Sequence, residues 1–172
     1  MAPLNFDRSP FRGFDLPSTP LSHEVKWMQA CVMMAPLFST CSRRQYFAVV
    51  LSQNKRVVGV GYNGAPPKLK HCVDGGCPRG LSNVGHGSSY EAPEGFCIAQ
   101  HAEAGALLWS DAALRQGGTI IVNGPPCLEC ARLIASSGLK RVCYRPDASY
   151  VGFALVESFL SSAGVQLVQI VA

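Results

Sequence analysis

The sequence lacks a long apolar run and lacks the segment order of an export signal. A helix that crosses a bilayer needs about 20 consecutive apolar residues, and no segment approaches that length. The N-terminus shows no succession of a basic, an apolar and a small-residue segment. We therefore expect a soluble protein that is not exported, resides in the cytoplasm and has no membrane partner.

Charge is sparse as well. Charged residues make up 15% of the 172 residues, and the formal net charge is +4. Lysines and arginines are scattered along the chain, so we expect no surface that could follow a polyphosphate backbone and no nucleic-acid partner. A small anionic ligand fits this balance better. Apolar residues make up 48%, which at this length is enough to bury one core.

The chain divides into an N-terminal arm and one domain. Residues 1–21 contain prolines without a period of 2 or 3.6, so they are predicted to form an irregular arm. Residues 22–172 are predicted to form a single domain. The expected elements are a helix after the N-cap Ser22, strands at 46–51 and 56–61, a helix at 98–109, a strand at 119–122, a helix at 127–137, a strand at 141–144, a helix at 151–163 and a strand at 165–171. A hairpin followed by alternating helices and strands predicts a mixed five-stranded sheet with helices on both faces.

A long segment rich in glycine and proline, residues 62–96, separates the hairpin from the next helix. Segments of this length without secondary structure are uncommon in compact domains unless they are functional or held together. Four cysteines lie before, inside and at the end of it: Cys41, Cys72, Cys77 and Cys97. Four thiolates around a structural zinc would close such a loop. The alternative is that these cysteines are buried free thiols, with His71 or His86 taking the place of one of them as a metal ligand.

Metal-binding residue types begin two consecutive predicted helices. His101 and Glu103 form an H-x-E triplet, and Cys127 and Cys130 follow Pro126 in a P-C-x-x-C motif. Together these motifs are typical of zinc-dependent deaminases. Two thiolates and one imidazole leave a tetrahedral zinc with one position for water, whose pKa falls to roughly 7. Glu103 is then placed to carry a proton from that water to a leaving amine.

Each of these residues alone has a plainer interpretation. A single histidine is more often a core or capping residue, and two cysteines are more often a structural zinc knuckle or buried thiols. The joint occurrence at two helix starts favours a catalytic zinc. Glu103 also argues against a catalytically silent zinc-binding module, because a structural metal site has no use for a carboxylate beside an open position.

Four stretches carry a resemblance to a known family: residues 61–66 (Gly-Tyr-Asn-Gly-Ala-Pro), 101–103, 126–130 and 137–144. Over roughly residues 25–170 the chain resembles the deoxycytidylate deaminase branch of the cytidine deaminase superfamily. The resemblance implies a three-layer α/β/α sandwich and the hydrolysis of dCMP to dUMP and ammonia. It also implies a homohexamer regulated by dCTP and dTTP, with Mg²⁺ accompanying a nucleotide effector, and it adds weight to the structural zinc.

The resemblance further implies substrate contacts. Asn63 matches an asparagine that contacts the sugar, and the Ala102 amide matches a donor to the pyrimidine carbonyl. The superfamily often has a serine two residues before the first zinc cysteine, where this chain has Pro125. Only the backbone carbonyl group is needed at that position, so proline is compatible with it. Tyr144 is predicted to line the base pocket. The candidate phosphate contacts are Arg43, Arg44, Lys68, Lys70 and Arg145, although a solvated surface charge is the commoner role of each.

Two positions depart from the family pattern. Phe47 replaces a glycine in the first strand, and Gly105 stands where the family has an asparagine. We expect both to lie near the pocket, where they either repack or reshape it for a 5-substituted cytosine. The alternative functions are therefore deamination of a 5-substituted dCMP, or of another nucleotide or nucleoside.

Overall fold

A mixed sheet forms the centre of the computed structural model, which describes residues 21–85, 88 and 90–171. The predicted arm over 1–21 lies, except for Leu21, outside the described residues. The strands are β1 (Phe47–Leu51), β2 (Val57–Tyr62), β3 (Thr119–Val122), β4 (Arg141–Tyr144) and β5 (Gln166–Gln169), in the order β2-β1-β3-β4-β5. β1 is antiparallel to both of its neighbours, and β3, β4 and β5 are parallel.

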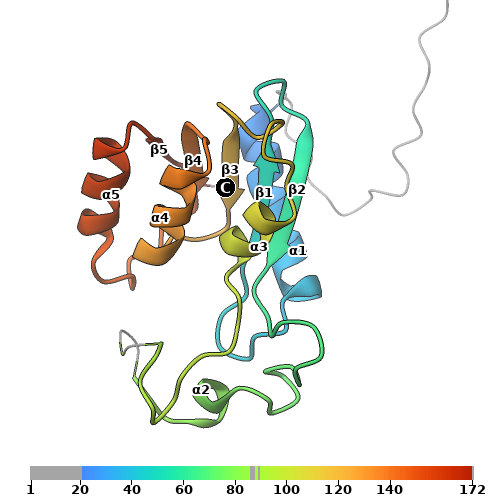
Figure 1. The fold of residues 1–172 in the computed structure, drawn as a ribbon, viewed down its shortest axis with the longest axis vertical. Helices are drawn as coiled ribbons and strands as arrows, with labels where there is room; N and C mark the ends of the chain where they lie inside the picture. Colours follow the sequence, from blue (N-terminus) through green and yellow to red (C-terminus); the bar gives the residue numbers. More distant parts are fainter. Residues whose placement is uncertain (1–20, 86–87, 89, 172) are drawn as a thin grey trace, which may run out of the picture.

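Helices cover both faces of this sheet, which confirms the predicted three-layer sandwich (Figure 1). α1 (His23–Phe38) packs against β1, β3 and β4 on one face. The other face carries α3 (Ala102–Leu108), α4 (Leu128–Ser136) and α5 (Phe153–Ser162). None of the helices in the described part of the chain has the length and apolar composition to cross a membrane.

The central strands are buried on both faces, and their side chains alternate between two cores. Along β1, Ala48 and Val50 join the core beneath α3, α4 and α5, whereas Phe47, Val49 and Leu51 join the core beneath α1. This alternation follows from the two-residue period of a strand. It decides which β1 side chains can reach a site on the α3 face.

Most predicted elements are present, but the helix predicted at 98–109 starts four residues later. The reason is a short antiparallel bridge in which the N–H and C=O of Gln100 pair with Gly64. Because this bridge holds the chain extended, His101 becomes the N-cap of α3. The segment 62–96, here called the excursion, contains one unpredicted element, the short helix α2 (Pro78–Leu81).

α3 lies on β2 with no side chain between them. A Cβ built on Gly61 would lie 2.2 Å from the carbonyl oxygen of Ala102 and 2.3 Å from the amide nitrogen of Ala106. A Cβ on Gly59 would lie 2.5 Å from the carbonyl oxygen of Ala106. Because these neighbours are backbone atoms that cannot move aside, only glycine permits this approach. The two glycines thus set the distance between α3 and the sheet.

Candidate active site

Three potential metal ligands meet where α3 and α4 begin. The Nδ1 atom of His101 lies 3.3 Å from Cys127 Sγ and 3.4 Å from Cys130 Sγ. All three ligand atoms lie within 4.8 Å of one another, and no other group of three His, Cys, Asp or Glu side chains in the described residues is as tight. The structure therefore brings together the three residues that the sequence motifs select.

Local helix geometry explains this arrangement. His101 is the N-cap of α3, and Cys127 is the N-cap of α4, where its sulfur accepts a hydrogen bond from the Cys130 amide at 3.4 Å. Cys130 lies in the first turn, so both sulfurs face the same side. Hydrogen bonds from Cys130 and His101 hold the pKa of Cys127 well below its usual value, and the interaction with Cys127 raises the pKa of His101. A thiolate beside two further soft donors suits zinc.

Glu103 lies beside this cluster and is 5% exposed. Burial raises the pKa of its carboxyl group, and the neighbouring charge of His101 opposes part of that effect. A hydrogen bond with Cys130 connects it to the ligand group. A buried carboxyl group with a raised pKa next to a metal cluster is a strong candidate for acid–base chemistry.

A cavity of about 530 Å³ opens beside His101. Its walls come from the segment before β1, from the excursion and from the loop between β4 and α5. The polar and aromatic residues that line it include Arg43, Arg44, Tyr46, Asn63, Arg79, Tyr90, Glu91, His101, Glu129, Ser149 and Tyr150. The sequence motifs predict only some of these lining residues. The others belong to no motif: Tyr46, Arg79, Tyr90, Ser149 and Tyr150.

Tyr150 is one of the lining residues that belong to no motif. Burial raises the pKa of its phenol to about 12, and charges on Cys127, Tyr90, Glu103 and Cys130 add to this rise. Its hydroxyl group therefore remains protonated at neutral pH and can donate a hydrogen bond into the cavity. The only sequence signal for it was an aromatic residue in a polar loop.

Asn63 is fixed in the cavity wall by several hydrogen bonds. Its Oδ1 atom accepts from Ser39 Oγ at 2.6 Å and from the Tyr46 amide at 2.8 Å, and its Nδ2 atom donates to the Arg44 carbonyl at 2.8 Å. An amide nitrogen carries two hydrogens. The second hydrogen has no acceptor among the described residues, and its contact with the sugar stays a prediction.

Two expected arginine contacts also line the cavity. Arg43 donates to the Arg79 carbonyl at 3.3 Å and to the Val84 carbonyl at 2.9 Å. Arg44 forms a salt bridge with Asp147 at 2.9 Å and donates to Ser149 Oγ at 3.2 Å. The other three candidate phosphate contacts, Lys68, Lys70 and Arg145, are exposed and do not line the cavity.

Other expected contacts lie outside the cavity wall. Ala102 and Pro125 are buried next to the metal ligands in the chain, and the Ala102 amide is the first N–H of α3. Tyr144 packs in the core, where its ring centroid lies 4.8 Å from that of Phe153. It does not belong to the cavity lining.

Of the two alternatives for Phe47 and Gly105, the structure favours repacking over a reshaped pocket, because neither residue lines the cavity. Phe47 points to the α1 face of the sheet, and its ring lies 5.6 Å from that of Phe38. The strand period places Ala48, not Phe47, on the face that carries α3. Gly105 faces β2, because a Cβ built on it would lie 3.6 Å from the Gly61 Cα atom. Both departures from the family pattern are packing changes.

Two cysteines of the excursion, Cys72 and Cys77, line the same cavity together with Cys41, which precedes the excursion, and Cys97, which follows it. The Cys77 side chain hydrogen-bonds with Cys72 and with Cys97. Burial raises the pKa of both Cys72 and Cys97, and the charge of Cys41 adds to this rise, so Cys41 lies nearby. The proposed alternative ligand His71 is exposed, and His86 lies outside the described residues.

A His-Cys-Cys cluster beside a buried glutamate, at two helix starts on a mixed sheet, defines a zinc-dependent deaminase type of site. The family description "Cytidine and deoxycytidylate deaminase zinc-binding region" matches residues 21–145. The chain therefore belongs to the cytidine and deoxycytidylate deaminase family of zinc-dependent hydrolases.

Individual relatives agree with this assignment. The deoxycytidylate deaminase of Mycobacterium phage D29 is 45% identical over 111 residues, which cover 64% of this chain and 84% of the phage protein. The deoxycytidylate deaminase of Schizosaccharomyces pombe is 37% identical over 133 residues, or 76% of this chain and 39% of the yeast protein. The dCMP deaminase of cyanophage S-TIM5, solved in complex with dCMP and dUMP, has the same fold, with a TM-score of 0.62 and 23% identity over 88% of this chain and all of that chain.

The first prediction separates metal binding from proton transfer. His101→Ala removes a ligand, so we expect the zinc content to fall by one ion per chain and deaminase activity to fall with it. Glu103→Gln should keep the full zinc content, because Glu103 is no ligand, yet lose roughly 10⁴-fold in kcat. Elemental analysis and ammonia release would measure both variants. A Glu103→Gln protein with near-normal activity would contradict the proton-transfer role.

Proposed function

We propose that this chain is a hydrolytic deaminase that converts dCMP to dUMP and ammonia. The observation that carries the proposal is the buried Glu103 carboxyl group beside His101, Cys127 and Cys130. The names of the relatives support the choice of substrate, since the phage and yeast proteins are both deoxycytidylate deaminases.

The chain's own residues account for the proton movements. Zinc, when bound by His101, Cys127 and Cys130, supplies a Lewis acid that activates water. Glu103 accepts the proton that the water releases and later donates a proton to the departing amine. Burial raises the pKa of this carboxyl group, which favours its protonated form. The Ala102 amide and the Pro125 carbonyl lie next to the ligands, where they would orient the pyrimidine ring.

We assign recognition of the 5′-phosphate to Arg43. Its two hydrogen-bond acceptors, the carbonyl oxygens of Arg79 and Val84, are neutral, and Arg43 forms no salt bridge within the described part of the chain. Arg44, by contrast, is neutralised by Asp147. We assign recognition of the sugar, which connects the phosphate to the base, to the remaining N–H group of Asn63.

The alternatives differ in what the site offers them. A preference for a 5-substituted dCMP loses its support, because Phe47 and Gly105 do not line the cavity. A free nucleoside would offer Arg43 no anionic partner. A catalytically silent zinc-binding module would gain nothing from burying Glu103, which costs free energy.

The second prediction concerns the substrate. We expect kcat/KM for dCMP to exceed that for deoxycytidine by at least about 10²-fold, because a charge-assisted contact in the cavity is lost without the phosphate. Arg43→Met should reduce this ratio about tenfold or more, and Lys68→Met, outside the cavity, should leave it unchanged. Ammonia release measures all of these. Equal kcat/KM for dCMP and deoxycytidine would contradict the proposal.

We also propose a structural zinc held by Cys41, Cys72, Cys77 and Cys97. Backbone N–H groups of Ile98, Gly80 and Arg79 hydrogen-bond to the Cys77 sulfur, and the Ser42 amide lies 3.5 Å from the Cys72 sulfur. Amides directed at sulfur stabilise thiolates, the form that binds zinc. The chain also wraps closely around the sulfurs, since a Cβ on Gly80 would lie 2.7 Å from Cys72 Sγ.

The third prediction concerns metal count. Purified protein should contain two zinc ions per chain, and Cys77→Ser should lose one of them together with several degrees of Tm. Cys143→Ser is the matched control, because Cys143 is a buried thiol outside both clusters. It should keep both ions. A wild-type content of one zinc per chain, by elemental analysis, would remove the second site.

The homohexamer and its regulation by dCTP and dTTP with Mg²⁺ remain proposals from the family resemblance. Apolar side chains on α1 support self-association, since Met33, Leu37 and Phe38 are 53%, 75% and 48% exposed. Light scattering after gel filtration distinguishes a hexamer from a monomer, and a monomer would refute the assembly.

A further inference from the structure

Tyr90 contacts the metal cluster from a part of the chain that no sequence motif covers. Its ring centroid lies 5.6 Å from that of His101, with the ring planes at 77°. The guanidinium carbon of Arg79 lies 4.4 Å from the centre of the same ring. The Tyr90 ring is therefore held between an imidazole ligand and a cation, an arrangement that fixes its orientation.

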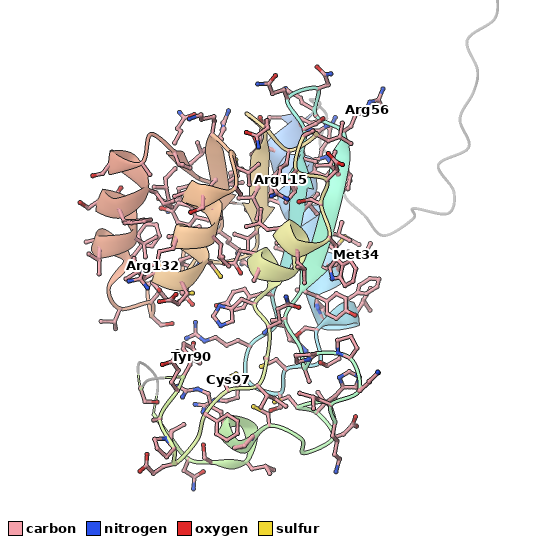
Figure 2. All side chains as sticks on the ribbon, viewed as in Figure 1. Met34, Arg56, Tyr90, Cys97, Arg115 and Arg132 are labelled. Carbon is pink, nitrogen blue, oxygen red and sulfur yellow. The ribbon has the colours of Figure 1, made fainter. Side chains whose placement is uncertain are left out.

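The excursion sets the position of this ring. The Cys97 amide donates to the Tyr90 carbonyl at 2.7 Å. Arg79 is 5% exposed and donates to the Ser88 carbonyl at 3.0 Å. Figure 2 shows Tyr90 and Cys97 on the side of the excursion nearer to the sheet. The turns that carry the cysteines thus also place Tyr90 against His101.

Tyr90 is not a core residue. Its side chain is 50% exposed, and it lines the cavity together with Asn63 and Tyr150. His101 lines the same cavity, so the reacting end of a substrate must lie near this residue. An exposed aromatic ring there offers a surface to a flat heteroaromatic ring, since such rings stack favourably.

We propose that Tyr90 is a substrate-binding residue whose ring contacts the base of the nucleotide, and that Arg79 is a positioning residue that acts through Tyr90. The proposal rests on the proposed function and adds a recognition residue to it. It also gives the excursion a second role: besides closing the fold, it supplies one wall of the substrate site.

The test compares truncation of Tyr90 with truncation of a similar residue in the same segment. Tyr90→Ala should raise KM for dCMP about tenfold or more, with kcat within about threefold of wild type and the zinc content unchanged. Because the ring makes the contact, Tyr90→Phe should stay within about threefold in KM. Phe96→Ala is the matched control: Phe96 is 45% exposed in the excursion but does not line the cavity. Its KM should match wild type.

Two further measurements separate recognition from loop stability. Tyr90→Ala should raise KM for dCMP and for deoxycytidine by the same factor, because the base is common to both. Arg43→Met should raise KM for dCMP only. Arg79→Met should raise KM in the wild-type background by a larger factor than in the Tyr90→Ala background, as positioning through Tyr90 requires, and equal factors in the two backgrounds would overturn this role of Arg79.

An unchanged KM in Tyr90→Ala, or an equal rise in Phe96→Ala, would overturn the proposal. Failure of the proposed function is distinguishable, because wild-type protein would then release no ammonia from dCMP. In that case calorimetry decides: a dCMP Kd that is the same for wild type and Tyr90→Ala, or the absence of binding to either, overturns the role of Tyr90.

Discussion

The direct contact between α3 and β2 is the constraint on which the site depends. Two glycines, Gly59 and Gly61, let the helix backbone rest on the strand backbone. This contact positions the start of α3, and with it His101 and Glu103, relative to the sheet. The sheet in turn carries β3, whose end leads into Cys127 and Cys130 at the start of α4. The metal ligands meet because both helix starts are placed by the same sheet.

That geometry also explains how a glutamate can be buried beside the ligands. Glu103 is the second residue of a helix whose first turn is enclosed between β2 and α4. Burial raises the pKa of the Glu103 carboxyl group, and burying this group in its charged form costs free energy. The fold is therefore less stable than it would be with an apolar residue here, and it keeps a titratable group next to the metal ligands. The excursion completes the site from another side, where Tyr90 lies against His101 and Arg79 lies over the Tyr90 ring.

The parts of this structure that follow local patterns could be predicted from the sequence. The three-layer fold followed from a hairpin and an alternation of helices and strands, and the His-Cys-Cys cluster followed from motifs at two helix starts. The late start of α3 could not be predicted, because a tertiary bridge between Gln100 and Gly64 holds the chain extended. The choice between repacking and a reshaped pocket at Phe47 could not be made from the sequence, because a motif does not give the face of the sheet on which a side chain lies.

The cavity walls were harder to predict for a related reason. Tyr90, Ser149 and Tyr150 come from irregular segments whose positions depend on contacts between residues far apart in sequence. Arg44, for example, holds the loop after β4 through Asp147 and Ser149. No periodicity or spacing encodes such contacts, whereas helix starts carry their own signals.

Substitution of Gly61 tests most directly whether the packing of α3 on β2 creates the site. In Gly61→Ala the new methyl group would meet the Ala102 carbonyl at 2.2 Å, so α3 must shift and carry His101 and Glu103 with it. Gly85→Ala is the control, since nothing lies within 4 Å of a Cβ at that position. We expect Gly61→Ala to lose most of its kcat/KM for dCMP and its zinc at the His101 cluster, and Gly85→Ala to retain both. Full zinc content and wild-type kcat/KM in folded Gly61→Ala would contradict this view of the site.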